Sequence, residues 1–139
     1  MIEAGLELGP TSWLEVTQER IDAFAAATED GQSIHVDPEL AAQGPYGTTV
    51  AHGFLTLSLL VHFWNELFER EGVTVNYGLN RVRFPAPVPA GSRIRAGFRV
   101  EAFDGRLATI LATVEREGGD KPVCVAELLL LFVEELLSK

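Results

Sequence analysis

The hydrophobic pattern of the chain changes its period near the middle. Between residues 54 and 70 (FLTLSLLVHFWNELFER), large apolar side chains lie on nearly every side of a helical projection over the first eleven positions. A helix of this kind has to be buried on all sides. Upstream, Ile21 and Phe24 belong to an amphipathic helical pattern that Thr17 can cap and that Gly31 can end. The first half of the chain is therefore expected to be mainly helical.

Strand patterns and turn signals fill the second half. The predicted strands cover residues 73–79, 80–88, 92–104, 106–118 and 121–135. Polar and apolar side chains alternate along the third of them, as a sheet with one packed face requires. Asp104-Gly105 and Gly119-Asp120 are hairpin signals, so the last strands are expected to form a consecutive antiparallel meander. Prolines at positions 85, 87 and 89 indicate an edge or a bend, because proline cannot donate a ladder hydrogen bond.

The remaining segments are short. Residues 12–16 (SWLEV) are strand-like, residues 34–36 (IHV) are expected to be briefly extended, and Asp37-Pro38 can open a single helical turn. The elements together predict one domain over residues 1–139 of the α+β class, in which an antiparallel sheet wraps around one central apolar helix. The length suits one domain with a real core.

Composition narrows the class of protein. The chain has 47% hydrophobic and 22% charged residues, which is typical of a soluble globular domain. No signal-like segment opens the sequence, and the apolar helical stretch is shorter than the roughly 20 residues that span a bilayer. A single cysteine, Cys124, lies in an apolar run and is expected to be a buried thiol in a reducing cytoplasm. The net charge of −9 argues against nucleic acid or an anionic membrane as the main partner.

The charge is nevertheless uneven. Residues 72–100 contain no acidic residue but include five arginines: Arg81, Arg83, Arg93, Arg95 and Arg99. Such a basic island could hold a small anionic ligand such as a phosphate. The arginines could equally lie on the solvent faces of strands and pair with glutamates elsewhere. The sequence leaves both interpretations open.

Candidate chemistry gathers in one segment, residues 28–58. Asp30 and His35 place a carboxylate and an imidazole five residues apart, and His52-Gly53 stands at the start of the apolar helix. An acid, a base and a helix N-terminus together favour proton transfer beside a developing negative charge. Each residue also has a structural interpretation: Asp30 as a helix-end residue, and His35 and His52 as buried structural histidines. The histidines and the single cysteine match no common metal-ligand spacing.

Three stretches of the sequence carry a family resemblance. They are TEDGQSIHVDP, GPYGTTVAHGFLTLSLL and YGLNRVRFPAPVPAGSRIR. With the order of the predicted elements they resemble the hotdog fold, and more closely the MaoC-like, (R)-specific enoyl-CoA hydratase family. The family motif has an Asp followed five residues later by a His, as Asp30 and His35 do here. Between them Gln32 and Ser33 replace the usual Asn-Pro, which is similar to the nodulation-protein-like branch.

The resemblance implies a hydro-lyase of fatty acid metabolism that needs no cofactor. It would add water reversibly to a trans-2-enoyl-CoA to give an (R)-3-hydroxyacyl-CoA, as a homodimer or a higher homo-oligomer. Asp30 and His35 would hold and activate one water, and the N–H of Gly53 would bind the thioester carbonyl. Possible substrate contacts are the side chains of the loop, the central helix and the basic island: Gln32, His52, Ser58, Arg81, Arg83 and Arg93.

Other functions remain compatible with the same residues. A hotdog thioesterase would use a carboxylate and water against the thioester carbonyl. An acyl-carrier-protein dehydratase would use the arginine island to meet a phosphopantetheine and an acidic carrier. A binding module for acyl thioesters, without catalysis, would explain the change to Gln32-Ser33.

Overall fold

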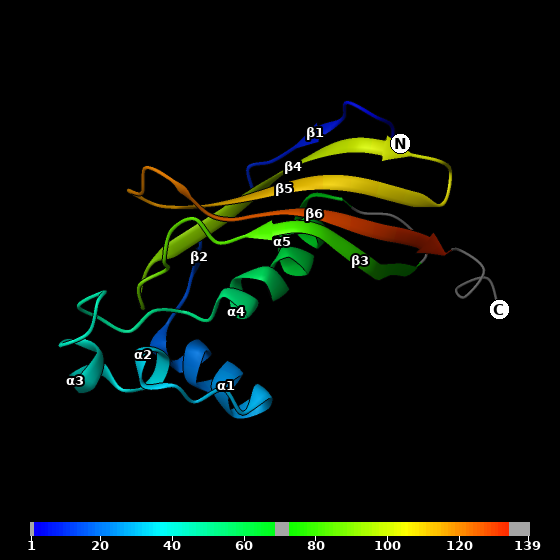
Figure 1. Cartoon of the computed structure of the whole chain (residues 1–139). Coiled ribbons are helices and arrows are strands. Elements are labelled where there is room, and N and C mark those ends of the chain that lie inside the picture. Colours follow the sequence, from blue (N-terminus) through cyan, green and yellow to red (C-terminus); the bar gives the residue numbers. More distant parts are fainter. Residues whose placement is uncertain (1, 69–72, 134–139) are drawn as a thin grey trace.

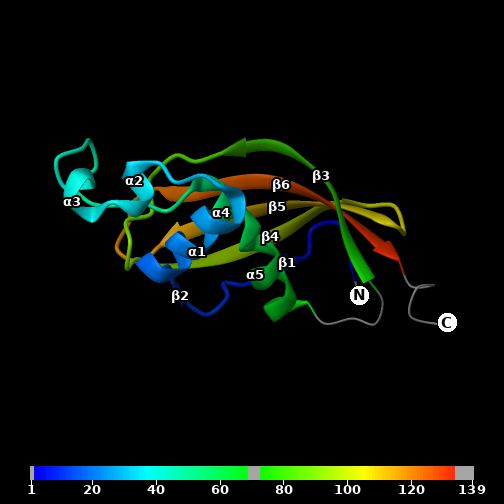
Figure 2. The same cartoon turned by 90° about the horizontal axis from the view of Figure 1, so that it is seen from below.

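The computed structural model describes residues 2–68 and 73–133. One antiparallel sheet has the order β1-β4-β5-β6-β3, with β2 also paired to β4, and the helices lie on one side of it (Figure 1). Seen from below, α4 and α5 cross the face of the sheet, and α1 to α3 gather at one end (Figure 2). The elements in chain order are β1 Glu7–Leu8, β2 Leu14–Glu15, α1 Gln18–Thr28, α2 Ser33–Val36, α3 Pro38–Ala41, α4 Gly53–Ser58, α5 Leu60–Leu67, β3 Val73–Arg83, β4 Arg93–Phe103, β5 Leu107–Arg116 and β6 Pro122–Val133.

The predicted meander is confirmed. β4 pairs with β5, and β5 with β6, both antiparallel, through the two turns that the sequence signals. The two strands predicted over residues 73–88 are instead one strand, β3, with irregular register between Asn76 and Gly78 and between Asn80 and Arg83. At a bulge an extra residue is accommodated without ending the strand, so the irregular alternation of polar and apolar residues does not divide β3 into two strands. The proline-rich segment after it bends away and keeps only a bridge between Val50 and Pro89.

The central helix differs from the prediction in two ways. It consists of α4 and α5, which meet at Leu59, and residues 69 and 70 of the predicted helix lie outside the described residues. Leu60, Phe63 and Trp64 are buried, but Phe54 is 68% exposed. The helix is therefore not buried on all sides within a single chain, because the sheet covers only one of its faces. Among the described helices, none is both long and apolar enough to cross a membrane.

The first helix begins as predicted, and the segment after it does not follow the prediction. Thr17 caps α1 by accepting a hydrogen bond from the N–H of Arg20. The helix ends at Thr28 with Glu29, rather than a glycine, in the left-handed region at φ 63°. Residues 34–36, expected to be extended, form the one-turn helix α2, and the N–H of Asp37 bonds to the carbonyl of Ser33 at 3.0 Å. Asp37 itself is extended, as a residue before proline prefers, so α2 stops after one turn.

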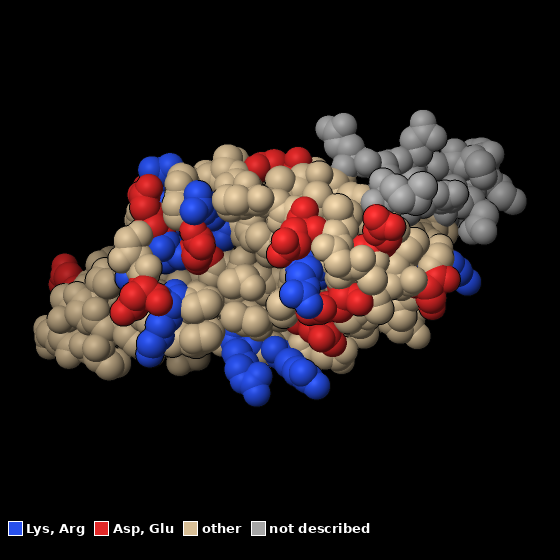
Figure 3. Space-filling view, turned by 90° about the horizontal axis from the view of Figure 1, so that it is seen from above, with Lys and Arg blue, Asp and Glu red and all other residues tan. Residues whose placement is uncertain are grey.

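The arginine island divides into paired and unpaired residues. Arg93 pairs with Glu117, Arg95 with Glu115 and Arg99 with Glu101, at 3.2, 2.7 and 3.1 Å. Figure 3 shows acidic and basic side chains interspersed over the outer face of the sheet. The interpretation as solvent-facing ion pairs is thus confirmed for these three arginines. Within the described residues, the side chains of Arg81 and Arg83 have no ion pair.

Cys124 gives a first test of the core. It lies on β6 opposite Val114 and is fully buried, and burial raises the pKa of its thiol from 9.0 to about 11. At pH 8 the thiolate fraction falls by about 100-fold, and only the thiolate reacts. We expect iodoacetamide to label the native protein about 10²-fold more slowly than the protein in denaturant. Equal labelling rates in the two states would contradict the buried position.

Candidate active site

His35 is fixed by a hydrogen bond on one side of its ring. Its side chain is buried, at 7% exposure, and Nδ1 lies 2.7 Å from the carbonyl oxygen of Val50. A carbonyl only accepts, so Nδ1 carries the hydrogen. In the neutral ring Nε2 is then the free acceptor. His35 is therefore oriented as a general base.

The backbone of α2 is held by residues that the sequence did not single out. Gln18 donates from Nε2 to the carbonyl of His35 at 2.8 Å, and its Oε1 accepts from the hydroxyl of Thr49 at 2.6 Å. The N–H of Val50 donates to the carbonyl of Ile34 at 2.9 Å. One amide side chain from α1 therefore ties α2 to the segment before α4. A glutamine in the first turn of a helix gives no sequence signal for such a role.

Asp30 approaches His35 from the loop after α1. One oxygen of its carboxylate and a ring nitrogen of His35 lie within 4.8 Å of each other. Two hydrogen bonds of about 2.8 Å that meet at a tetrahedral angle span about 4.6 Å, so two groups within 4.8 Å of each other are close enough to share one water. Gln32 donates from Nε2 to Oδ1 of Asp30 at 3.4 Å. In this structure Gln32 therefore contacts the carboxylate itself.

His52 lies directly against His35. The two rings stack with centroids 3.8 Å apart and planes 23° apart, and the side chain of His52 is only 2% exposed. Nε2 of His52 lies 2.9 Å from the backbone carbonyl of Asp30, while Nδ1 is buried without a partner in the described chain. The lone pairs of two stacked rings lie in nearly parallel planes, so they do not converge on one point. This arrangement does not suit one metal ion at about 2.0–2.1 Å from both rings, although the Asp30 carboxylate is also near.

Gly53 opens α4 at the mouth of a pocket. Its N–H, the first of the helix, has no hydrogen-bond partner among the described residues. A Cβ at this position would lie 3.1 Å from the ring of Phe84, so glycine permits this close packing. His35, Gly53 and Thr56 line a pocket of about 390 Å³ together with apolar side chains and the proline-rich segment: Ile34, Tyr46, Val50, Ala51, Phe84, Pro85, Ala86, Pro87, Val88 and Val123. Thr56 on α4 and Phe84 carry no sequence signal for a place in this pocket, which forms only when residues 84–88 fold back beside α4.

The other predicted substrate contacts lie outside this pocket lining. Ser58 is exposed on α4 and donates to the carbonyl of Phe54 at 2.7 Å. Arg93 is held by Glu117 and lies over the ring of Trp13, 5.6 Å from its centroid. Arg81 and Arg83 are exposed at the end of β3, just before Phe84. The structure brings together Asp30, His35, His52 and Gly53. Of these four residues, His35 and Gly53 line the pocket, and neither the three arginines nor Ser58 are among its lining residues.

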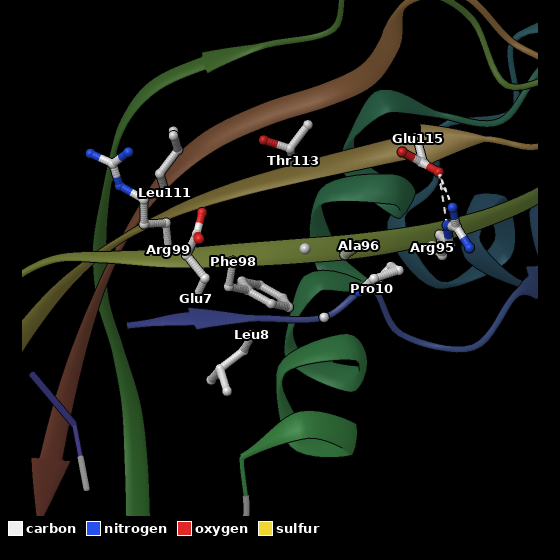
Figure 4. Close-up of a pocket in the computed structure, with 12 residues that line it drawn as sticks. Glu7, Leu8, Pro10, Arg95, Ala96, Phe98, Arg99, Leu111, Thr113 and Glu115 are labelled. Atoms are coloured by element: carbon white, nitrogen blue, oxygen red, sulfur yellow. Dashed lines mark hydrogen bonds and ion pairs between the residues drawn. The ribbon is translucent and has the colours of Figure 1, made fainter. Parts of the chain in front are cut away.

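A larger hollow, of about 600 Å³, lies between β1, β4 and β5 (Figure 4). Gly97 and Thr113 line its floor, and the ion pair of Arg95 and Glu115 stands at one end. The hollow lies on the outer face of the sheet, whereas Trp64 of α5 packs on the inner face. None of Asp30, His35, His52 or Gly53 lines it. We therefore place the candidate site in the pocket at the start of α4.

The sequence is similar to known proteins over most of its length. Residues 3–121 match the family described as MaoC like domain. The chain is 50% identical over 137 residues to 3-hydroxyacyl-thioester dehydratase Z of Mycobacterium tuberculosis, covering 94% of this chain and 91% of the relative. It is 47% identical over 131 residues to Nodulation protein N of Rhizobium leguminosarum bv. viciae, covering 88% and 81%.

A solved structure agrees at the level of the fold. The (R)-hydratase from A. caviae involved in PHA biosynthesis superposes with a TM-score of 0.81 at 24% identity, covering 94% of this chain and 96% of that chain. The predicted hotdog fold is thereby confirmed, as is the α+β class. The family match and the relatives show more than the fold. The chain belongs to the MaoC-like domain family and is an enzyme of the MaoC dehydratase type.

Proposed function

We propose that this enzyme interconverts a 3-hydroxyacyl-CoA and a trans-2-enoyl-CoA by removal or addition of water, with the (R) configuration at C3. The single observation that carries the proposal is the pairing of Asp30 and His35. A carboxylate oxygen and an imidazole nitrogen lie within 4.8 Å of each other, and the hydrogen bond to Val50 leaves Nε2 of His35 free to accept a proton. The similarity to a relative named as a 3-hydroxyacyl-thioester dehydratase supports the substrate class.

The two side chains can divide the proton transfers of this reaction. In hydration, the water oxygen attacks C3, one side chain takes a proton from that water, and the other delivers a proton to C2. Because both act on one water between them, the two new bonds form on the same face. General acid–base assistance of this kind contributes about 10²- to 10⁴-fold. In dehydration the same transfers run in reverse.

Gly53 can supply the hydrogen-bond donor that the thioester oxygen needs during the reaction. Addition at C3 moves negative charge onto the thioester oxygen, which needs a hydrogen-bond donor. The N–H of Gly53, which has no partner within residues 2–68 and 73–133, stands at the start of α4 in the same pocket as His35. Without a Cβ, the residue lets a thioester approach the backbone closely. We therefore assign Gly53 as the donor to the developing enolate.

The first experiment is an absorbance assay with crotonyl-CoA and the purified protein. A fall at the enoyl-thioester band without release of free thiol is the expected result, and chiral analysis of the product is expected to give the (R) isomer. Release of free thiol would instead indicate a thioesterase. If longer enoyl-CoA and acyl-carrier-protein substrates were bound but unchanged, the protein would be a binding module, and the proposal would be wrong.

Arg81 and Arg83 are the arginines best placed to contact a coenzyme A phosphate. They are exposed and unpaired in the described chain, whereas Arg93 is held by Glu117. Replacing Arg83 or Arg81 with Gln is expected to raise KM several-fold with little change in kcat, because contacts away from the reacting atoms stabilise substrate and transition state alike. Arg93→Gln is the matched control with the same charge change. Unchanged KM in both variants would remove the phosphate role.

A homodimer fits the surface that a single chain leaves uncovered. Among the described strands, β3 pairs with β6 alone, so its other edge has no partner strand in this part of the chain. Its apolar side chains Val75, Tyr77 and Leu79 are exposed, as is Phe54 on α4. An exposed edge strand with large apolar side chains is normally covered by another chain. We propose that a second copy covers this surface, and sedimentation analysis that gives a monomer would contradict it.

The proposed chemistry consists of proton transfers and oxyanion stabilisation, so it needs no cofactor beyond the coenzyme A of the substrate. The buried free thiol of Cys124 suits a reducing compartment. We therefore propose the cytoplasm as the place where the enzyme acts.

A further inference from the structure

One ring, that of His52, contacts both members of the acid–base pair. Nε2 lies 2.9 Å from the backbone carbonyl of Asp30, and the ring centroid lies 3.8 Å from that of His35. Phe24 of α1 packs against His52 with the ring centroids 4.9 Å apart. His52 also directly precedes Gly53, so the same residue joins the loop of Asp30, the one-turn helix of His35 and the start of α4.

The hydrogen bonds fix complementary tautomers for the two rings. The carbonyl of Asp30 can only accept, so Nε2 of His52 carries a hydrogen. For His35 the same argument puts the hydrogen on Nδ1, toward Val50. Nδ1 of His52 is left buried without a partner in the described chain, so a proton there would bring a charge with no acceptor. The two hydrogen bonds therefore leave Nδ1 of His52 and Nε2 of His35 as the nitrogens without a hydrogen when the rings are neutral.

Building on the proposed function, we infer that His52 is a positioning residue for the catalytic pair. Its N–H holds the Asp30 loop, and its ring stacks on the ring of His35 and so restricts the direction in which Nε2 of His35 points. Among the described residues, the Asp30 carboxylate lies near both rings, and the Asp22 carboxylate is linked to the backbone of His35 through the amide of Gln18. A neutral π face also stabilises the imidazolium that forms when His35 takes a proton.

The unpartnered Nδ1 of His52 is evidence that this ring does more than fill space in the core. A buried polar atom without a hydrogen bond is unfavourable for folding, so a ring that served apolar packing alone would carry carbon at that position. His52→Phe keeps an aromatic ring and removes the buried acceptor, but it also removes the donor to Asp30. If His52 serves the site, this variant keeps its melting temperature and loses activity. If His52 serves packing alone, activity and stability change together.

Two variants distinguish the two contacts. In glutamine the amide nitrogen is the same number of bonds from Cα as Nε2 of histidine, so His52→Gln keeps a donor for Asp30 and loses the stacked ring. His52→Phe does the reverse. Displacement of a reacting group by about 1 Å can lower a rate about 10²-fold. We expect His52→Phe to lower kcat by about that factor with KM little changed, and His52→Gln to restore part of the loss.

Phe24→Leu is the matched control. It removes the aromatic ring that packs against His52 and leaves the hydrogen bonds of His52 and His35 in place. We expect a lower melting temperature but wild-type kcat and a wild-type pH profile of kcat/KM. Equal losses of kcat in Phe24→Leu, His52→Gln and His52→Phe, in proportion to lost stability, would overturn the inference.

Nitrogen-15 spectra of the imidazole rings give a second readout that needs no turnover. The chain has three histidines, and His62→Gln, at an exposed position, identifies the remaining signals. We expect the Nε2–H tautomer for His52, the Nδ1–H tautomer for neutral His35, and a titration midpoint of His35 that moves in both His52 variants but not in Phe24→Leu. The opposite tautomer of His52, or an unmoved midpoint, would overturn the inference even if no thioester were turned over.

Discussion

Asp30→Asn is expected to lower kcat for hydration of crotonyl-CoA by about 10²- to 10⁴-fold, the usual contribution of an acid–base group. Asparagine keeps the size and one oxygen of the side chain, so the contact with Gln32 and the backbone bond from His52 can persist. It removes the negative charge and the ability to exchange a proton with the bridging water. Binding of the enoyl thioester should therefore remain, and the melting temperature should change little. Steady-state kinetics and calorimetric titration measure the two effects separately.

The neighbouring carboxylate provides the control. Glu29 is exposed and adjacent in sequence, so Glu29→Gln removes the same charge without reaching His35. Its kcat should stay close to that of the wild type. If Asp30 and His35 act on one water, the variant that lacks both side chains should be hardly slower than the slower single variant. Fully additive losses would contradict joint action on a single water.

The sheet was predictable because its signals are local. Alternation along residues 92–104 and the turn dipeptides at residues 104–105 and 119–120 act within a few residues, and the structure confirms the resulting meander. The short strand β1 gave no such signal, since it forms only by pairing Glu7 and Leu8 with β4. The apolar helix was recognised, but its exposed face was not, because burial depends on what lies opposite in space.

The candidate site was predictable in part for the same reason. Asp30 and His35 follow a spacing that can be read along the chain, and the structure brings them together. The stacking of His52 on His35 and the tether from Gln18 join residues 17 positions apart in each case. Such contacts arise from tertiary packing and leave no periodic pattern. Ion pairs in the basic island were one of two open interpretations, but the partner of Arg95 could not be named, because Arg95 meets Glu115 only through the register of β4 and β5.

A pair of substitutions at Gly53 is expected to isolate the contribution of one backbone N–H. Gly53→Ala and Gly53→Pro both place a Cβ about 3.1 Å from the ring of Phe84, and only proline also removes the donor. Gly53 is the first residue of α4, a position where proline is favoured. His52 already has φ −60° and ψ 137°, which suits a residue before proline. Both variants should therefore fold with similar stability.

The difference in rate between these two variants measures the donor. Phe84 is 41% exposed and can shift to admit a methyl group, so Gly53→Ala should keep a substantial part of the wild-type kcat. Loss of one oxyanion donor typically lowers kcat by about 10²- to 10³-fold, or about 2.7–4 kcal/mol of transition-state stabilisation. We expect Gly53→Pro to be slower than Gly53→Ala by that factor while its melting temperature matches. Equal rates in the two folded variants would show that another group stabilises the enolate, because Gly53→Pro lacks the backbone N–H that Gly53→Ala keeps.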